Sequence, residues 1–172
     1  MRRIPISLAV AALLTCFTIG AQTLNFTKDD IEYTVELPSP AWHALSRLDV
    51  HDHVDFMYGA DSANGYLRLT KKLVAAGVTP ADLFRHDEKW ELQSLSGYVV
   101  CSACTGENFE GNLKGAAFSY EYSSGGRPMA GRIYYLQLDN RTFYALHFTA
   151  TAGKLNSLCS EMESIARTFR LK

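Results

Sequence analysis

The chain has 172 residues, of which 47% are hydrophobic and 20% charged. This length can bury a substantial core, and the composition excludes an intrinsically disordered protein. The formal net charge of −1 argues against the strongly basic surface of a nucleic-acid-binding protein, so no nucleic-acid partner is expected.

The N-terminus has the layout of a cleavable secretory signal peptide, which we place at residues 1–21. Arg2 and Arg3 give a positive start, a mostly apolar stretch follows, and small residues come just before Gln22. This pattern predicts cleavage between Ala21 and Gln22. We therefore expect an exported protein, periplasmic or extracellular, with no transmembrane span after cleavage.

Two alternatives to a simple signal peptide stay open. The first is an N-terminal membrane anchor, although the apolar run is shorter than the ~20 residues that span a bilayer. The second is lipidation of Cys16, although Thr15 stands where bacterial lipoprotein signals usually have Gly or Ala. Since no linker divides the remainder, residues 22–172 are predicted to form a single α+β domain.

Strands are predicted in the first third of this domain. Apolar and polar residues alternate from Ile31 to Leu37, which is the period of a half-buried strand. Residues 54–58 and 66–71 suggest a second and a third strand, separated by a turn-like segment at 61–65.

A helix is predicted to follow these strands. Thr79 suits the N-cap, Pro80 the first helical position and Asp82 the positive end of the helix dipole. We expect the helix to run to about Leu95. The apolar residues expected to face the sheet are Leu83, Phe84, Trp90 and Leu92.

The second half predicts a pair of hairpins. Strands are expected at residues 116–122, 130–138 and 143–150, joined by a Gly-rich turn at 123–128 and a tight loop at Asp139–Asn140. The last of these strands is apolar on both faces. A sheet covered on both sides would explain that pattern.

A helix is predicted over residues 153–168, because apolar residues recur there at steps of three and four. Cys159 lies on this stripe and is expected to be a buried small hydrophobe. Together, these elements predict an antiparallel sheet of about six or seven strands with helices packed on it. The stripe consists of Leu155, Leu158, Cys159, Met162, Ile165 and Phe169.

The sequence resembles the PsbP/DcrB-like domains. The hairpin at 131–150 leading into a closing helix that ends at 165–169, and the early strand at 33–38 followed by Trp42, are similar to those domains. The resemblance implies an αβα sandwich that is often exported or lumenal and often lipid-anchored. It also implies a binding, assembly or envelope-associated role without catalysis, and it carries over no catalytic residues.

A candidate metal site lies in the segment around residue 52. In an extended chain, Asp49, His51, His53 and Asp55 would all point to one side, and imidazoles with flanking carboxylates can hold a divalent metal. The alternative is the solvent-facing side of an edge strand or loop. That alternative is favoured, because alternating polarity is typical of any half-exposed strand. No other cofactor is expected.

Three cysteines follow the predicted signal peptide. Cys101 and Cys104 have the spacing of a small structural disulfide, a redox pair or half of a metal site. The activating helix of a redox pair is missing after Cys104, and Cys159 could supply only one further metal ligand. A structural disulfide is therefore favoured in an oxidising compartment, with free thiols as the next alternative.

No catalytic motif is present in the sequence. His86 is expected to face solvent on a charged helix side, and His147 is expected to be packed and hydrogen-bonded within a strand. The favoured hypothesis is an exported non-catalytic module that binds a protein or cell-envelope partner. The alternative is a metal- or thiol-dependent enzyme that uses His51 and His53, or Cys101 and Cys104.

Overall fold

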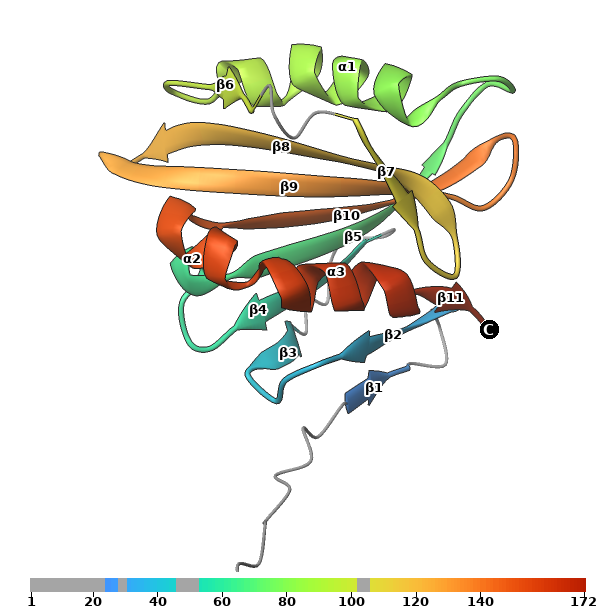
Figure 1. The fold of residues 1–172 in the computed structure, drawn as a ribbon, viewed down its shortest axis with the longest axis horizontal. Helices are drawn as coiled ribbons and strands as arrows, with labels where there is room; N and C mark the ends of the chain where they lie inside the picture. Colours follow the sequence, from blue (N-terminus) through green and yellow to red (C-terminus); the bar gives the residue numbers. More distant parts are fainter. Residues whose placement is uncertain (1–23, 28–30, 46–52, 102–105) are drawn as a thin grey trace, which may run out of the picture.

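The computed structural model describes residues 24–27, 31–45, 53–101 and 106–172 (Figure 1). Several predicted features lie outside these ranges: the signal peptide with its cleavage site at Ala21 and Gln22, and Cys16, Asp49, His51 and Cys104. Within the described ranges, no helix has the length and apolar character needed to cross a bilayer.

The main layer is an antiparallel sheet of eight strands. In chain order they are β3 (Trp42–Leu45), β4 (His53–Tyr58), β5 (Tyr66–Leu73), β6 (Val99–Val100), β7 (Glu107–Glu110), β8 (Lys114–Ser124), β9 (Arg127–Gln137) and β10 (Thr142–Thr151). Their spatial order is β3-β4-β5-β10-β9-β8-β6, and β7 also pairs with β8. The predicted α+β fold is confirmed, and the strand count exceeds the expected six or seven because β3, β6 and β7 are short and carry little alternation.

The long hairpins place β9 and β10 at the centre of the sheet. Ser124 pairs with Arg127, so only Gly125 and Gly126 turn the chain between β8 and β9. Both glycines have positive φ, 57° and 75°, which is the backbone of the two-residue turns that match strand twist. The long strands are therefore held in one register by a turn that favours glycine.

One side of the main sheet is covered by a small sheet and two helices (Figure 1). The small sheet has the order β1-β2-β11. Its strands are β1 (Leu24–Phe26), β2 (Tyr33–Leu37) and β11 (Arg170–Leu171), and the helices are α2 (Ala152–Ser157) and α3 (Cys159–Thr168). Below, this is called the α3 side.

The helix predicted over 153–168 is therefore two helices with a break at Leu158. The backbone of Leu158 (φ −92°, ψ 1°) ends α2, and its buried side chain packs into the core between α2 and α3. Met162 and Ile165 continue the buried stripe from Leu158. Cys159 follows Leu158 by one residue, which turns it away from that stripe, so it is exposed and the prediction of a buried cysteine is wrong.

The opposite side of the sheet, called the α1 side, carries α1 (Pro80–Trp90) and the 3-10 helix η2 (Leu92–Ser94) (Figure 1). As predicted, Thr79 caps α1: its hydroxyl accepts from the Asp82 N–H at 3.2 Å, and the Asp82 carboxylate accepts from the Thr79 N–H at 2.9 Å. A second 3-10 helix, η1 (Ser62–Asn64), joins β4 to β5.

Trp90 lies on the sheet-facing stripe of α1 but is not packed against the sheet, since 67% of it is exposed. α1 ends at Trp90, so no further turn packs against the indole, and Leu92 of η2 occupies the buried position instead. Leu83 and Phe84 are buried as expected, and the Phe84 ring stacks on Phe118 at 4.5 Å.

β10 confirms that the sheet is covered on both sides. Tyr144, Leu146 and Phe148 belong to the apolar core of the α3 side, whereas Phe143 and Ala145 belong to the core beneath α1. His147 follows Phe143 and Ala145 on that face, where the apolar pattern stops.

Candidate functional site

α1 covers only part of its side of the sheet. Its buried residues pack in one cluster with residues of β8 and β9, such as Phe118 and Tyr135. Strand register places Asp55 opposite Arg68, and Arg68 opposite His147, on the α1 side of β4, β5 and β10. We call this surface the open half-face, made by Asp55, Tyr66, Arg68, Thr70 and His147; all except Asp55 are partly exposed.

Arg68 is held rigidly at the centre of the open half-face. Its Nε donates to Asp55 Oδ1 at 2.9 Å, and its Nη2 donates to Asp55 Oδ2 at 3.2 Å and to the Tyr66 hydroxyl at 2.8 Å. The hydrogen bonds that Arg68 donates to Asp55 raise the pKa of the guanidinium above its ordinary value. Nη1 makes no hydrogen bond within the described parts of the chain, and 40% of the side chain is exposed.

Asp55 is therefore placed differently from the sequence interpretation. We expected it on a solvent-facing side with Asp49, His51 and His53, but its side chain is buried beside Arg68. Burial is tolerated because the guanidinium compensates the carboxylate charge in a two-bond pair. The best-defined role of Asp55 is to orient Arg68.

His147 is paired with a tyrosine that reaches it across a neighbouring strand. The Tyr120 hydroxyl and His147 Nε2 form a hydrogen bond of 2.6 Å. Tyr120 lies on β8 and His147 on β10, so the tyrosine ring passes over Gly131 of β9; a Cβ at Gly131 would come within 2.2 Å of that ring. The prediction of a packed, hydrogen-bonded histidine is confirmed.

The surroundings of His147 keep its imidazole neutral at pH 7. Burial lowers the pKa of His147 to about 4, and the positive charges of Lys72 and Arg68 act in the same direction. The carboxylate of Asp87 opposes them. A neutral ring in a hydrogen bond can bind a polar group, but its low pKa makes it a poor proton acceptor near neutral pH.

Asp87 lies where α1 meets β5, at the border of the open half-face. Both of its carboxylate oxygens accept from Lys72 Nζ, at 2.7 and 2.6 Å, and Oδ2 also accepts from the Tyr135 hydroxyl at 2.7 Å. His86 Nδ1 lies 3.3 Å from Oδ1. Because these contacts come from α1, β5 and β9, Asp87 clamps the helix onto the sheet.

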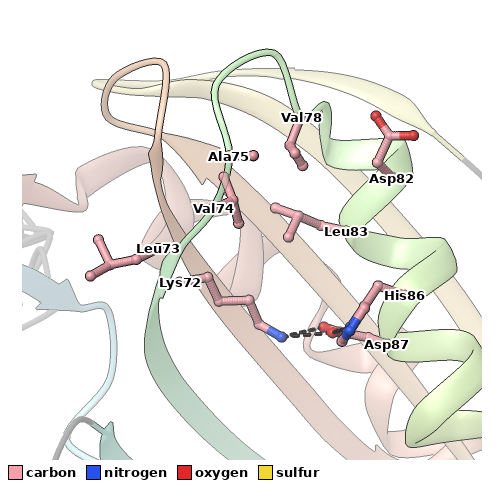
Figure 2. A pocket seen from close by; sticks show the side chains of 9 residues that line it. All are labelled: Lys72, Leu73, Val74, Ala75, Val78, Asp82, Leu83, His86 and Asp87. Atoms are coloured by element: carbon pink, nitrogen blue, oxygen red, sulfur yellow. Dashed lines mark hydrogen bonds and ion pairs between the residues drawn. The ribbon is translucent and has the colours of Figure 1, made fainter.

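A pocket of about 490 Å³ opens beside this clamp (Figure 2). Apolar side chains form one part of its wall, and the Lys72–Asp87 pair and His86 form another; Leu73 is 75% exposed. Its lining residues are Lys72, Leu73, Val74, Ala75, Val78, Asp82, Leu83, His86 and Asp87. His86 itself is exposed, as predicted.

Trp90 ends α1 on the side of the helix that faces β5, the side from which Asp87 reaches Lys72. It follows Asp87 by three positions and Leu83 by seven, so it lies on the stripe of α1 that includes these two residues. The end of α1 is linked to Tyr120 through Tyr98, whose hydroxyl donates to Glu88 at 3.2 Å and whose ring centroid lies 5.7 Å from that of Tyr120. Sequence reasoning missed Trp90 as a surface residue, because a tryptophan in an amphipathic helix normally packs.

The candidate metal and thiol residues are only partly described. His53 begins β4 and pairs with Thr70, at the edge of the open half-face. Where the chain is described, no three His, Cys, Asp or Glu side chains gather as a metal centre would require. The Cys101 N–H donates to the Ser119 carbonyl at 3.0 Å. With Asp49, His51 and Cys104 outside the described residues, the metal site and the disulfide stay predictions.

Comparison with known proteins defines the fold. No family model and no curated protein matches the chain. Solved structures do match, but their sequence identities to this chain are so low that the likeness shows the fold alone. Cyanobacterial PsbP (CyanoP) from Synechocystis sp. PCC 6803 has a TM-score of 0.60 at 12% identity, covering 93% of this chain and 99% of its own.

Two further structures extend the likeness. LpqN of Mycobacterium tuberculosis, described as involved in cell envelope biogenesis, has a TM-score of 0.55 at 16% identity and covers 88% of this chain and 91% of its own. The Saccharomyces cerevisiae Ran-binding protein Mog1p has a TM-score of 0.59 at 9% identity, covering 88% and 96%. The chain therefore has the PsbP-like fold.

Proposed function

We propose that the protein is an exported, non-catalytic module that binds a partner in the cell envelope through the open half-face. The observation that carries this proposal is the geometry of Arg68. Its guanidinium is fixed by Asp55 and Tyr66 while Nη1 is left to donate outward. A donor fixed in this way loses little conformational entropy when it binds, which favours recognition.

The chemistry of the site supports binding over catalysis. Asp55 and Asp87, its buried carboxylates, are each paired with a cation, and His147 is neutral, so the described groups are arranged to hold hydrogen bonds. LpqN is described as involved in cell envelope biogenesis and Mog1p as a Ran-binding protein. A binding role for this chain would agree with the role of Mog1p, and a place in the cell envelope with that of LpqN.

Export can be tested by the intact mass of the protein purified from its own cells without reductant. The proposal expects a mass that corresponds to Gln22–Lys172, and a loss of two hydrogens would indicate one disulfide. A mass that starts at Cys16 and includes lipid would mean an exported lipoprotein. The mass of the complete chain with Met1 would contradict cleavage.

Binding can be tested by sedimentation of the purified protein with the cell-envelope fraction. Arg68→Lys keeps a positive charge for Asp55 but removes the outward pair of N–H donors. Its matched control is Arg167→Lys, because Arg167 also pairs with a carboxylate, that of Glu163, but lies on α3. We expect Arg68→Lys to weaken co-sedimentation and Arg167→Lys to leave it unchanged. Equal sedimentation of all three proteins would refute binding through the open half-face.

A further inference from the structure

We propose that the open half-face and Trp90 together bind a neutral oligosaccharide. This inference rests on the proposed function and names the class of partner that the same site takes.

The first step is the charge balance, which disfavours an ionic ligand. Arg68 is paired with Asp55, and Lys72 is paired with Asp87 at 2.6 Å. A phosphate or carboxylate site would instead need a cation without a carboxylate counterpart. With both cations already compensated, a ligand without net charge fits this surface best.

The second step is the supply of hydrogen bonds. Arg68 Nη1 presents two N–H donors in a fixed plane, and the partly exposed Thr70 adds a hydroxyl one position further along the same face. A sugar hydroxyl both donates and accepts, so neighbouring hydroxyls can pair with such a mixed set without leaving a charge unpaired. Rigid polar groups recognise such a ligand with little loss of side-chain entropy.

Trp90 adds an indole that is 67% exposed and lies one turn beyond Asp87, on the side of α1 that faces β5. The face of an aromatic ring carries negative charge density, which attracts the weakly positive C–H groups on the flat side of a sugar ring. A polar ligand with one apolar side therefore suits an indole next to fixed donors. Lys89 Nζ lies 4.9 Å from the Trp90 ring centroid and would have to shift on its flexible stem.

The composition of the surface also distinguishes a glycan from a protein partner. The centre of a protein interface is depleted of charged residues and is mostly apolar. The centre of the open half-face is instead made by Arg68, Asp55 and His147. These polar groups would lose their remaining hydration against an apolar protein surface without new hydrogen bonds.

The test uses tryptophan fluorescence, because the two tryptophans of the chain differ in exposure. Trp42 is 1% exposed and Trp90 is 67% exposed, so acrylamide quenching reports mainly on Trp90. The probes are the β-1,4-linked tetramer of N-acetylglucosamine, cellotetraose and maltotetraose. At least one is expected to protect Trp90 from quenching in a saturable way, with a Kd of about 1 mM or lower.

Variants then connect the signal with the site. Calorimetric titration should show that Trp90→Ala and Arg68→Lys each raise Kd about tenfold or more, whereas Trp90→Phe removes the fluorescence signal and retains most of the affinity. The control is Val99→Ala: Val99 is 61% exposed and pairs with Glu121, on the other side of the sheet from Tyr120. This control should leave Kd unchanged.

Two outcomes would overturn the inference. One is that none of the three tetramers gives saturable protection or measurable heat. The other is binding whose Kd is the same in Trp90→Ala and Arg68→Lys as in the wild type. If co-sedimentation with the envelope still depends on Arg68 in either case, the glycan is the wrong ligand and the proposed function stands. If co-sedimentation does not depend on Arg68, both the glycan ligand and the proposed function are wrong.

Discussion

The two sides of the main sheet have different compositions, although the same strands build them. On the α3 side, Trp42, Phe56, Leu146 and Phe148 belong to one continuous apolar core, each with at most 1% exposed. On the α1 side, the apolar cluster lies beneath the helix, and polar groups around Arg68 occupy the surface of β4, β5 and β10. The α3 side is therefore apolar core throughout, whereas on the α1 side only the part beneath the helix is apolar core.

β10 shows the difference within three residues. Leu146 and Phe148 point to the α3 side and are buried among aromatic and aliphatic side chains, whereas His147 between them points to the α1 side and bonds to Tyr120. Burial of apolar area contributes roughly 25 cal/mol per Å². Most of the free energy of folding should therefore come from the α3 side, which leaves the polar half of the other side available for binding.

The largest effect is expected from Phe148→Ala. The Phe148 ring contacts Trp42 and Tyr134, with ring centroids at 6.1 and 5.8 Å, and is fully buried. Its removal leaves a cavity and should lower the free energy of unfolding by about 4 kcal/mol in urea denaturation. Thr149→Ala, one residue away on the α1 side, should cost less than about 1 kcal/mol. Similar losses for both variants would contradict the contrast between the two sides.

The second effect concerns the clamp between α1 and the sheet. Asp87→Ala would leave Lys72 Nζ and the Tyr135 hydroxyl without their shared acceptor. We expect a loss of about 3 kcal/mol in the free energy of unfolding, and not more, because Lys72 can still bind water. Tyr135→Phe removes only one of these bonds and should cost about 1 kcal/mol. If Asp87→Ala costs no more than Tyr135→Phe, Asp87 does not clamp the helix.

The third effect is a pH dependence that originates at His147. Its pKa is about 4 in the folded protein and 6.5 in the unfolded chain, so the unfolded state binds more protons between these values. The contribution of His147 is complete above pH 6.5 and is lost as the pH falls toward 4. It should amount to about 2 kcal/mol, since the half-buried ring keeps part of its solvation.

This contribution can be isolated by urea denaturation of the wild type and His147→Gln between pH 4 and 7. Glutamine can still bond to Tyr120 but does not titrate, so the variant should lose less stability on acidification. Lys72, Arg68 and Asp87, which act on His147, are present in both proteins. Parallel curves for the two proteins would mean that His147 keeps an ordinary pKa when folded.

The sequence predicted the parts of the fold that rest on local patterns. Alternation located the strand at Tyr33–Leu37, and Thr79 with Asp82 located the start of α1, because periodicity and capping act over a few residues. The break at Leu158 escaped prediction because the apolar stripe continues through it. Only packing against the sheet shows that the chain turns there and leaves Cys159 outside.

The candidate site was much less predictable. Asp55 and Arg68 are 13 positions apart and meet only because β4 and β5 pair in one register. Tyr120 and His147 meet because β9 carries a glycine between them. Such pairs depend on the strand order of the whole sheet, which alternation alone does not specify.

The smallest effect on stability is expected from Trp90→Ala, although tryptophan is the largest side chain. Because the indole is mostly in water and follows the last packed turn of α1, its removal should change the free energy of unfolding by less than about 0.5 kcal/mol. Leu92→Ala, two residues later but 3% exposed, should cost about 2–3 kcal/mol in the same urea denaturation. A loss for Trp90→Ala as large as that for Leu92→Ala would mean that Trp90 belongs to the stabilising half of the α1 side. A negligible loss would mean that folding does not require an indole at this position, which is the condition for assigning it to binding.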